Sequence, residues 1–278
     1  QAVVSQASAA ALGQGSLDWE LASRQHDDYV VSLSKIVDSV EVLPPLESHP
    51  DCPFVEDTVV YARGVAVTLR QGHESRRGEV DAVREALATR PSLKSIETVH
   101  MEDQDPEALC DGGDVFFTGR HMFVGISERT NEAGAAALSK AFGASLPVIP
   151  VPVSGALHLK SLVSLLKPGV LLFAKNDAGS EAVARMAVGA GHAAYRAIGV
   201  PDEVSANALT VINKGEWRGT LIHGGRCDES RWLIRKSFTK EEQASFLLAA
   251  RILEVDFSEV IKADAGLTCC SVLLGGQP

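Results

Sequence analysis

Five short segments of the chain share one pattern, in which a polar or reactive residue leads into an apolar run. They are FVEDTVVYA (54–62), CDGGDVFFTG (110–119), LHLKSLVSLL (157–166), SANALTVIN (205–213) and GLTCCSVLL (266–274). With Asp57, Asp111, His158, Asn207 and Cys269 as markers, the steps along the chain are 54, 47, 49 and 62 residues. Residue identity between the segments is slight. If the repeat is real, it predicts five strand–helix modules arranged radially, each directing one residue to a common centre.

Helical and extended patterns alternate along the whole chain, which is typical of an α/β protein. Two apolar runs interrupted by Arg63-Gly64 and Gly119-Arg120 predict β-hairpins over 59–70 and 116–126. No Pro- or Gly-rich linker interrupts the pattern, so we expect residues 1–278 to form a single domain. Apolar residues at helical spacing predict helices over 16–37, 74–91, 131–142, 180–199 and 239–255.

The charge of the chain limits its partners. The 278 residues carry a formal net charge of −10, with a pI near 5.3. This argues against a surface for nucleic acid or anionic membranes, because phosphate binding needs clustered Lys and Arg. No apolar run is long enough to span a bilayer. A cationic small molecule is a compatible ligand.

Cysteine usage points to a reducing compartment. The five cysteines are an odd number without a Cys-X-X-Cys pair, which is a poor framework for disulfides or for structural zinc. Reduced thiols in turn predict a cytoplasmic protein. These cysteines are Cys52, Cys110, Cys227, Cys269 and Cys270.

The adjacent Cys269 and Cys270 lie where a glycine-containing loop meets an apolar run that we expect to be a strand. One interpretation is that both thiols pack in the core, where free cysteine is common. Because successive strand side chains point to opposite faces, the alternative is that one thiol faces a site while the other packs. As a nucleophile, Cys269 needs a histidine brought near it in space.

Two further markers are candidates for the same site. His158 stands beside apolar residues in GALHLKSLV and is interpreted either as a structural histidine or as the catalytic partner of a thiol. Asp111 opens DGGDVFFTG, where paired glycines indicate a tight turn. A turn-forming aspartate is the alternative to a functional one.

Three carboxylates, Asp51, Glu56 and Asp57, lie within seven residues in HPDCPFVEDTVV. Carboxylates at the start of a buried strand need a cationic partner, because desolvation of an unpaired charge is costly. Arg76 and Arg129 lie where helices are expected to begin, and by default both are surface residues.

In order, spacing and flanking residues, these motifs resemble the dimethylarginine dimethylaminohydrolases, a family within the amidinotransferase and arginine deiminase superfamily. This resemblance implies a five-fold pseudosymmetric α/β propeller, the pentein fold, and a flexible lid over about residues 1–16. From about residue 24 to 274 the matching stretches are RQHDDYV, PDCPFVEDT, SRRGEVD, DGGDVFFTGRHMFVGIS, RTNEAG, LHLKS, ANALTVIN and GLTCCSVL.

The resemblance also implies a mechanism. Cys269 is expected to attack the guanidinium carbon of a free methylated arginine and to form a covalent thiouronium intermediate. His158, oriented by Asp111, is expected to protonate the departing amine and then to activate water. The products are citrulline and dimethylamine or methylamine, and no cofactor takes part. Zinc is expected only as an inhibitor, because a thiolate and an imidazole are too few ligands for a structural site.

The remaining site residues follow from the same resemblance. Asp57 is expected to hold the guanidinium nitrogens, with Glu56 beside it. The substrate is the expected partner, and the chain is a monomer or a homodimer. The α-amino and α-carboxylate groups are assigned to Asp51, Arg76, Arg129 and the backbone carbonyl of Ala263.

Two alternatives stay open. An arginine deiminase shares the Cys, His and Gly-Gly-Asp features, but deiminases typically carry Asp two residues after the catalytic His, where this chain has Lys160. The other alternative is a non-catalytic relative that binds methylarginine without turnover. The presence of Cys269, His158, Asp111 and Asp57 argues against it.

Overall fold

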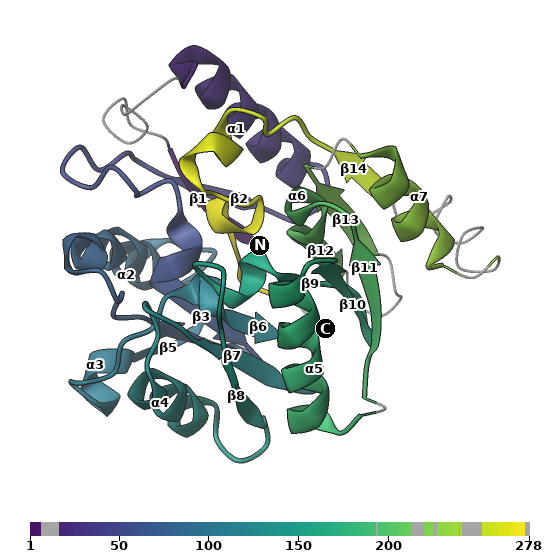
Figure 1. Cartoon of the computed structure of the whole chain (residues 1–278). Helices are drawn as coiled ribbons and strands as arrows, with labels where there is room; N and C mark the ends of the chain where they lie inside the picture. The colour runs from purple at the N-terminus through teal and green to yellow at the C-terminus, as the bar shows by residue number, and fades with distance from the viewer. Residues whose placement is uncertain are drawn as a thin grey trace.

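The strands in the described part of the chain form five sheets of three strands each (Figure 1). The computed structural model describes residues 1–6, 17–192, 194–212, 219–224, 227–238, 240 and 252–275. In every sheet a central strand pairs antiparallel with one neighbour and parallel with the other. The repetition of this unit confirms the five-module α/β propeller that the repeat and the family resemblance predict.

Four of the sheets are formed by consecutive strands. The first contains β3 (Val59–Ala62), β4 (Val65–Thr68) and β5 (Glu97–His100), and the second β6 (Val115–Phe117), β7 (Met122–Ile126) and β8 (Val148–Pro152). The third contains β9 (Val163–Lys167), β10 (Val170–Ala174) and β11 (Arg196–Val200), and the fourth β12 (Ala208–Ile212), β13 (Gly219–His223) and β14 (Ile252–Glu254).

The fifth sheet joins the two ends of the chain. Strand β15 (Val272–Leu273) pairs antiparallel with β1 (Ala2–Ser5), which pairs parallel with β2 (Val40–Leu43). The N-terminal strand therefore completes a module that the C-terminal strand begins.

The first strand of each sheet faces a common axis. Residues of β3, β6, β9, β12 and β15 line one narrow cavity of about 120 Å³. Each marker residue of the sequence repeat lies in a short helical turn directly before one of these strands. These turns are Val55–Thr58, Gly112–Asp114, Leu159–Ser161, α6 (Glu203–Ala206) and Thr268–Cys270, with Asp111, His158 and Asn207 at the turn boundaries. The radial convergence of the markers follows from this arrangement.

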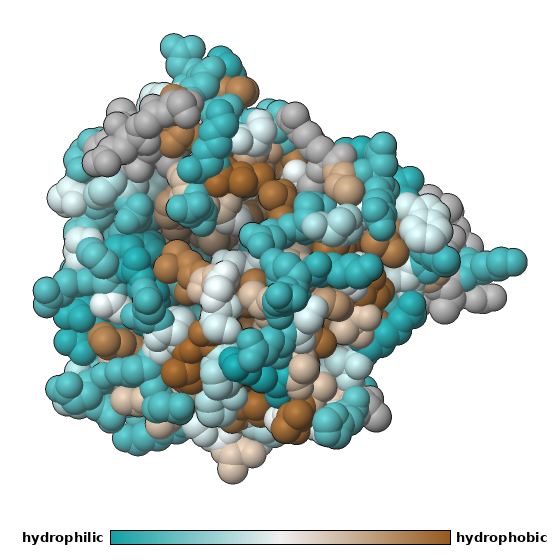
Figure 2. All heavy atoms as spheres, in the orientation of Figure 1, coloured by the Kyte–Doolittle hydropathy of each residue, from teal (hydrophilic) through white to brown (hydrophobic). Residues whose placement is uncertain are grey.

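Helices connect the strands, and α2, α3, α4 and α7 lie on the outside of the sheets (Figure 1). Hydrophilic side chains dominate the outline of the face in Figure 2, with apolar ones showing nearer its middle. No helix among the described residues is both long and apolar enough to cross a membrane. Among the described residues, the α-helices longer than four residues are α1 (Trp19–Ser34), α2 (Val80–Thr89), α4 (Glu132–Phe142), α5 (Asp177–Ala190) and α7 (Asp228–Lys236), and α3 spans Met101–Gln104.

Local chemistry explains several boundaries. Asp18 and Asn131 cap α1 and α4 by accepting backbone N–H bonds at 3.0 and 2.8 Å. The hairpin between β3 and β4 turns at Arg63 and Gly64, both with positive φ, as a two-residue hairpin loop requires. The two predicted hairpins and the helices over 16–37 and 131–142 are confirmed, with shifted ends.

Three predictions need correction. The helix expected over 180–199 begins earlier and ends at Ala190, because Gly191 adopts φ 87° and the chain continues into β11. The segment 74–91 begins as a 3-10 helix, Glu74–Glu79, before α2. At 239–255 the end of the expected helix is strand β14, and most of the remainder lies outside the described residues.

Candidate active site

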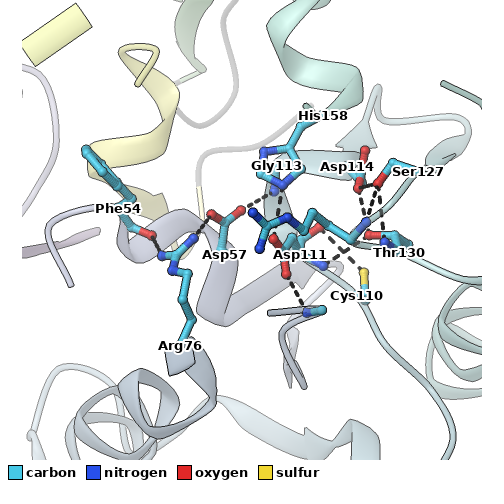
Figure 3. Close-up of polar contacts among 12 residues, drawn as sticks. Phe54, Asp57, Arg76, Cys110, Asp111, Gly113, Asp114, Ser127, Thr130 and His158 are labelled. Carbon is cyan, nitrogen blue, oxygen red and sulfur yellow. Dashed lines mark hydrogen bonds and ion pairs between the residues drawn. The ribbon is translucent and has the colours of Figure 1, made fainter. Parts of the chain in front are cut away.

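Three of the marker residues, Asp57, Asp111 and His158, lie close together (Figure 3). They meet where the turns before β3 and β6 approach the turn before β9. One side-chain atom each of Asp57, Asp111 and His158 lies within 4.8 Å of the others. His158 Nε2 is 3.0 Å from Asp111 Oδ2, and all three side chains are buried. A Cβ on Gly113 would lie 2.6 Å from His158 Nδ1, so the glycine is what lets the ring approach the backbone.

The charges of these residues are strongly coupled. Burial disfavours the imidazolium of His158, but Asp57 and then the hydrogen bond to Asp111 outweigh it and raise the pKa of His158 to about 9. Burial acts against the Asp57 carboxylate too, yet His158 and Arg76 lower its pKa overall. The site therefore holds a protonated imidazole beside an ionised carboxylate at neutral pH.

Arg76 is buried under Asp57 and is not the surface residue that its position before a helix predicts. Its Nη1 donates to Asp57 Oδ2 at 2.6 Å, and Nε and Nη2 donate to the Glu79 carboxylate. Nη2 also donates to the backbone carbonyls of Phe54 and Asp51. The guanidinium thus anchors Asp57, and the expected contact of Arg76 with the substrate stays a prediction.

Glu56 is bound on the opposite side of the same turn. Lys160 Nζ donates to its Oε1 at 2.6 Å, and Thr268 Oγ1 donates to its Oε2 at 2.9 Å. Asn207, the fourth marker, braces this group by bonding the Lys160 carbonyl and the backbone N–H of Thr268. Each oxygen of Glu56 therefore accepts from one protein donor, and its expected place beside the substrate stays a prediction.

The two cysteines lie in a 3-10 turn, Thr268–Cys270, and not on a strand as predicted. Cys270 is fully buried in the core, whereas Cys269 is half-buried. Burial, then the charges of Glu56 and Asp57, raise the pKa of Cys269 to about 12. The thiol is therefore neutral in the free protein, in an environment that a cation would change.

Arg129 and Ala263 are both half-buried. Within the described part of the chain, the Arg129 guanidinium has no recorded hydrogen-bond or ion-pair partner, which leaves it available to an anion. Its backbone packs against Gly72, whose N–H donates to Asp111 Oδ1 at 2.9 Å. Ala263 ends a 3-10 turn directly before Asp264, a non-glycine residue with φ 55°. Asp51 is half-buried, and its carbonyl accepts from Arg76.

Sequence reasoning missed Asp114, Glu79 and Thr268, and it did not place Lys160 and the marker Asn207 around Glu56. Asp114 directly precedes the apolar run VFF, which is the same signal that singled out Asp57. Glu79 lies three residues after Arg76, a spacing at which an ion pair within a helical segment could have been expected. Lys160 and Glu56 are 104 residues apart, and no local pattern reveals their contact.

Comparisons with known proteins identify the family of the chain. The family model for the eukaryotic N,N dimethylarginine dimethylhydrolases matches residues 13–160. The human protein named putative hydrolase DDAH2 is 34% identical over 241 residues, which covers 85% of this chain and 78% of that protein. The chain belongs to the dimethylarginine dimethylaminohydrolase family. The Streptomyces coelicolor member is also 34% identical, over 93% of this chain and 88% of its own.

Solved structures of the family have the same fold. A dimethylarginine dimethylaminohydrolase adduct with 4-chloro-2-hydroxymethylpyridine superposes with a TM-score of 0.74 at 27% identity, over 98% of both chains. A cysteine-to-serine mutant of the Pseudomonas aeruginosa enzyme, complexed with citrulline, gives 0.71 at 26% identity, over 98% and 97% of the two chains. These likenesses confirm the family and the propeller fold that the sequence predicts.

Proposed function

We propose that the chain hydrolyses free methylated arginines, asymmetric dimethylarginine and monomethylarginine, to citrulline and dimethylamine or methylamine. The observation that carries the proposal is the meeting of Asp57, Asp111 and His158, with His158 held as an imidazolium. The half-buried Cys269 supplies a nucleophile whose pKa responds to the charge of Asp57. Family members named as dimethylarginine dimethylaminohydrolases support the choice of substrate.

Binding of the substrate and activation of the thiol are linked. We assign the guanidinium N–H donors of the substrate to the anionic carboxylate of Asp57, and its α-carboxylate to the guanidinium of Arg129. Burial, and then the charges of Glu56 and Asp57, hold the pKa of Cys269 at about 12, so little thiolate exists in the free protein. A bound guanidinium offsets those charges and lowers the thiol pKa, so that the thiolate forms next to its target.

His158 gives a proton in the first step and takes one back in the second. The Cys269 sulfur bonds to the guanidinium carbon, the bond from that carbon to the methylated nitrogen breaks, and His158 gives its proton to the departing amine. The neutral imidazole next takes a proton from water, which attacks the thiouronium carbon. The carbon–sulfur bond breaks, the hydroxyl proton of the adduct replaces the one that the thiol lost to solvent when it became a thiolate, and citrulline leaves. Asp111 keeps the ring in place through both steps. The reaction as proposed uses no cofactor, and zinc remains expected only as an inhibitor.

The site favours a methylated arginine over arginine, the unmethylated substrate of a deiminase. Lys160 donates to Glu56 at 2.6 Å, so the position where deiminases typically have an aspartate here supplies a cation that neutralises a second carboxylate. With Glu56 paired to Lys160, we assign the substrate guanidinium to Asp57 alone, which suits a guanidinium whose second terminal nitrogen has lost its donors to methylation.

A citrulline assay with asymmetric dimethylarginine tests the proposal. The wild-type protein should form citrulline, and Cys269→Ser should form none above background, whereas Cys270→Ser should stay active. A haloacetamidine, which mimics the guanidinium, should label Cys269, as located by peptide mass spectrometry. Tight binding of methylarginine without citrulline would replace the enzyme with a binding protein, and labelling at Cys270 would reject the choice of nucleophile.

A further inference from the structure

Asp114 is a fully buried carboxylate that the proposed mechanism does not use. Its Oδ1 accepts a hydrogen bond at 2.9 Å from the backbone N–H of Leu159, the residue that follows His158. Its Oδ2 accepts from the hydroxyls of Ser127 and Thr130, both at 2.7 Å (Figure 3). Three donors on one buried group are more than is needed to cap a turn.

The two hydroxyls extend the contacts of Asp114 to the rest of the site. Thr130 Oγ1 accepts from the backbone N–H of Asp111 at 3.1 Å, and Ser127 Oγ accepts from that of Arg129 at 3.0 Å. Each hydroxyl thus accepts an N–H with its oxygen and donates its own proton to Asp114. The carboxylate therefore acts only as an acceptor and connects three segments of the site.

The strand behind Asp114 is shaped to admit it. Gly125 interrupts the apolar strand β7, and a Cβ at this position would lie 2.4 Å from Asp114 Oδ1 and 3.0 Å from Leu159 Cβ. A glycine inside a strand is unfavourable unless something approaches its backbone closely. Here the Asp114 carboxylate and the side chains of Val153 and Leu159 are what approach.

The charge of Asp114 acts on the imidazole. Burial raises the pKa of Asp114, while the nearby His158 and the hydrogen bonds from Ser127, Thr130 and Leu159 oppose this rise. In return, Asp114 adds to the effects of Asp57 and Asp111 that raise the pKa of His158.

We propose that Asp114 is a positioning residue, which holds His158 in register with Asp111 and favours the protonated imidazole. The inference rests on the proposed function, because the proton concerned is the one given to the departing amine. Asp114 touches no substrate and acts through the histidine.

The Asp114→Asn variant is nearly isosteric and removes the charge while keeping an oxygen for the Leu159 N–H. We expect its kcat near pH 8 to fall about tenfold with KM changed by less than about threefold. The titration of His158, followed by NMR in a Cys269→Ser background, should have its midpoint at about 9. The same titration should move down by about half a unit or more in Asp114→Asn.

A matched pair at Thr130 keeps the charge of Asp114 and tests the geometry alone. Thr130→Ser retains the hydroxyl and should stay within about twofold of the wild-type kcat, whereas Thr130→Val should lose about fivefold. This pair carries the test should Asp114→Asn fail to fold.

An unchanged His158 midpoint and kcat in Asp114→Asn, with only a lowered melting temperature, would make Asp114 a purely structural residue. Equal kcat in the two Thr130 variants would likewise overturn the positioning role. The NMR titration needs no turnover, so a shifted midpoint in a protein that forms no citrulline would reject the proposed function and leave the positioning role standing.

Discussion

Glu56 and Asp57 are adjacent carboxylates in one 3-10 turn, and both are buried, yet they have opposite surroundings. Asp57 accepts from Arg76 and from the backbone N–H of Gly113, and its pKa is lowered. Glu56 accepts from Lys160 and Thr268, and burial outweighs these partners and raises its pKa.

This difference assigns Asp57 to the proposed chemistry of the site and Glu56 to the structure that holds the site in place. Asp57 stands beside His158, and its charge sets the proton affinity of the ring. Glu56, Lys160 and Thr268 line the narrow central cavity, so this group forms a wall between the cavity and the site. Two adjacent carboxylates thus have different roles, because the two sides of one turn face different neighbours.

The sharpest way to break this comparison is to neutralise each carboxylate in turn. Asp57→Asn should lower kcat/KM by roughly a hundredfold to a thousandfold, because it removes the charge that holds the guanidinium and supports the imidazolium. Glu56→Gln should cost less than about tenfold, since Lys160 already neutralises this side chain. Steady-state citrulline formation measures both, and equal losses would remove the distinction between the two residues.

The second prediction concerns stability. Lys160→Met leaves Glu56 buried without its cation, and we expect the free energy of unfolding to fall by about 3 kcal/mol. The double variant Lys160→Met/Glu56→Gln should recover much of this loss, because no buried charge remains. Lys140→Met, on the exposed surface of α4, is the matched control and should change little. Denaturant unfolding measures all three, and a loss below about 1 kcal/mol in Lys160→Met would show that the pair contributes little.

The third prediction is substrate choice. We expect kcat/KM for mono- and asymmetric dimethylarginine to exceed that for arginine at least tenfold, about 1.4 kcal/mol. Symmetric dimethylarginine should be poor, because it removes a donor from the side that Asp57 holds. The difference in kcat/KM between the methylated arginines and arginine should decrease in Lys160→Met, because Glu56 there becomes free to bind the additional N–H groups of arginine. If arginine is the best substrate of the wild-type protein, the deiminase alternative is correct.

The five-module architecture could be predicted because each module repeats a local signal, a polar marker before an apolar strand. The hairpin at Arg63-Gly64 was predictable for the same reason, since turn geometry depends on adjacent residues. The helix end at Ala190 was not, because the small residues of 180–199 remain compatible with helix until Gly191 turns the chain.

Some features of the site could likewise be predicted from the sequence, and others could not. The meeting of His158 with Asp111 follows from their equivalent places in the repeat. The burial of Arg76 under Asp57 does not, because a helix-start arginine is by default exposed and its partners come from another turn. The lid expected over about residues 1–16 is wrong in part, because Ala2–Ser5 form β1, the buried central strand of the fifth sheet. Residues 7–16 lie outside the described residues, and a lid there stays a prediction.

The smallest expected effect is on the pH profile, where the two carboxylates should again differ. His158 must carry a proton to release the amine, so kcat should be about half its neutral value at pH 9 and should fall further above it. This follows from the pKa of His158, which is raised to about 9 with Asp57 as the chief favourable cause. Glu56→Gln should leave the midpoint in place, since Glu56 is not among those causes.

The stability of the folded protein should also depend on the proton bound to His158. The pKa of His158 is raised from 6.5 to about 9, so the folded protein binds the proton more tightly than the unfolded chain. Its contribution to stability is therefore complete below about pH 6.5 and is lost as the pH rises through about 9. Unfolding measured across that range should show the decline in wild-type protein and in Glu56→Gln, and a weaker one in Asp57→Asn. A flat profile in the wild type would mean that His158 is neutral in the folded state, and the assignment of His158 as the acid would then fail.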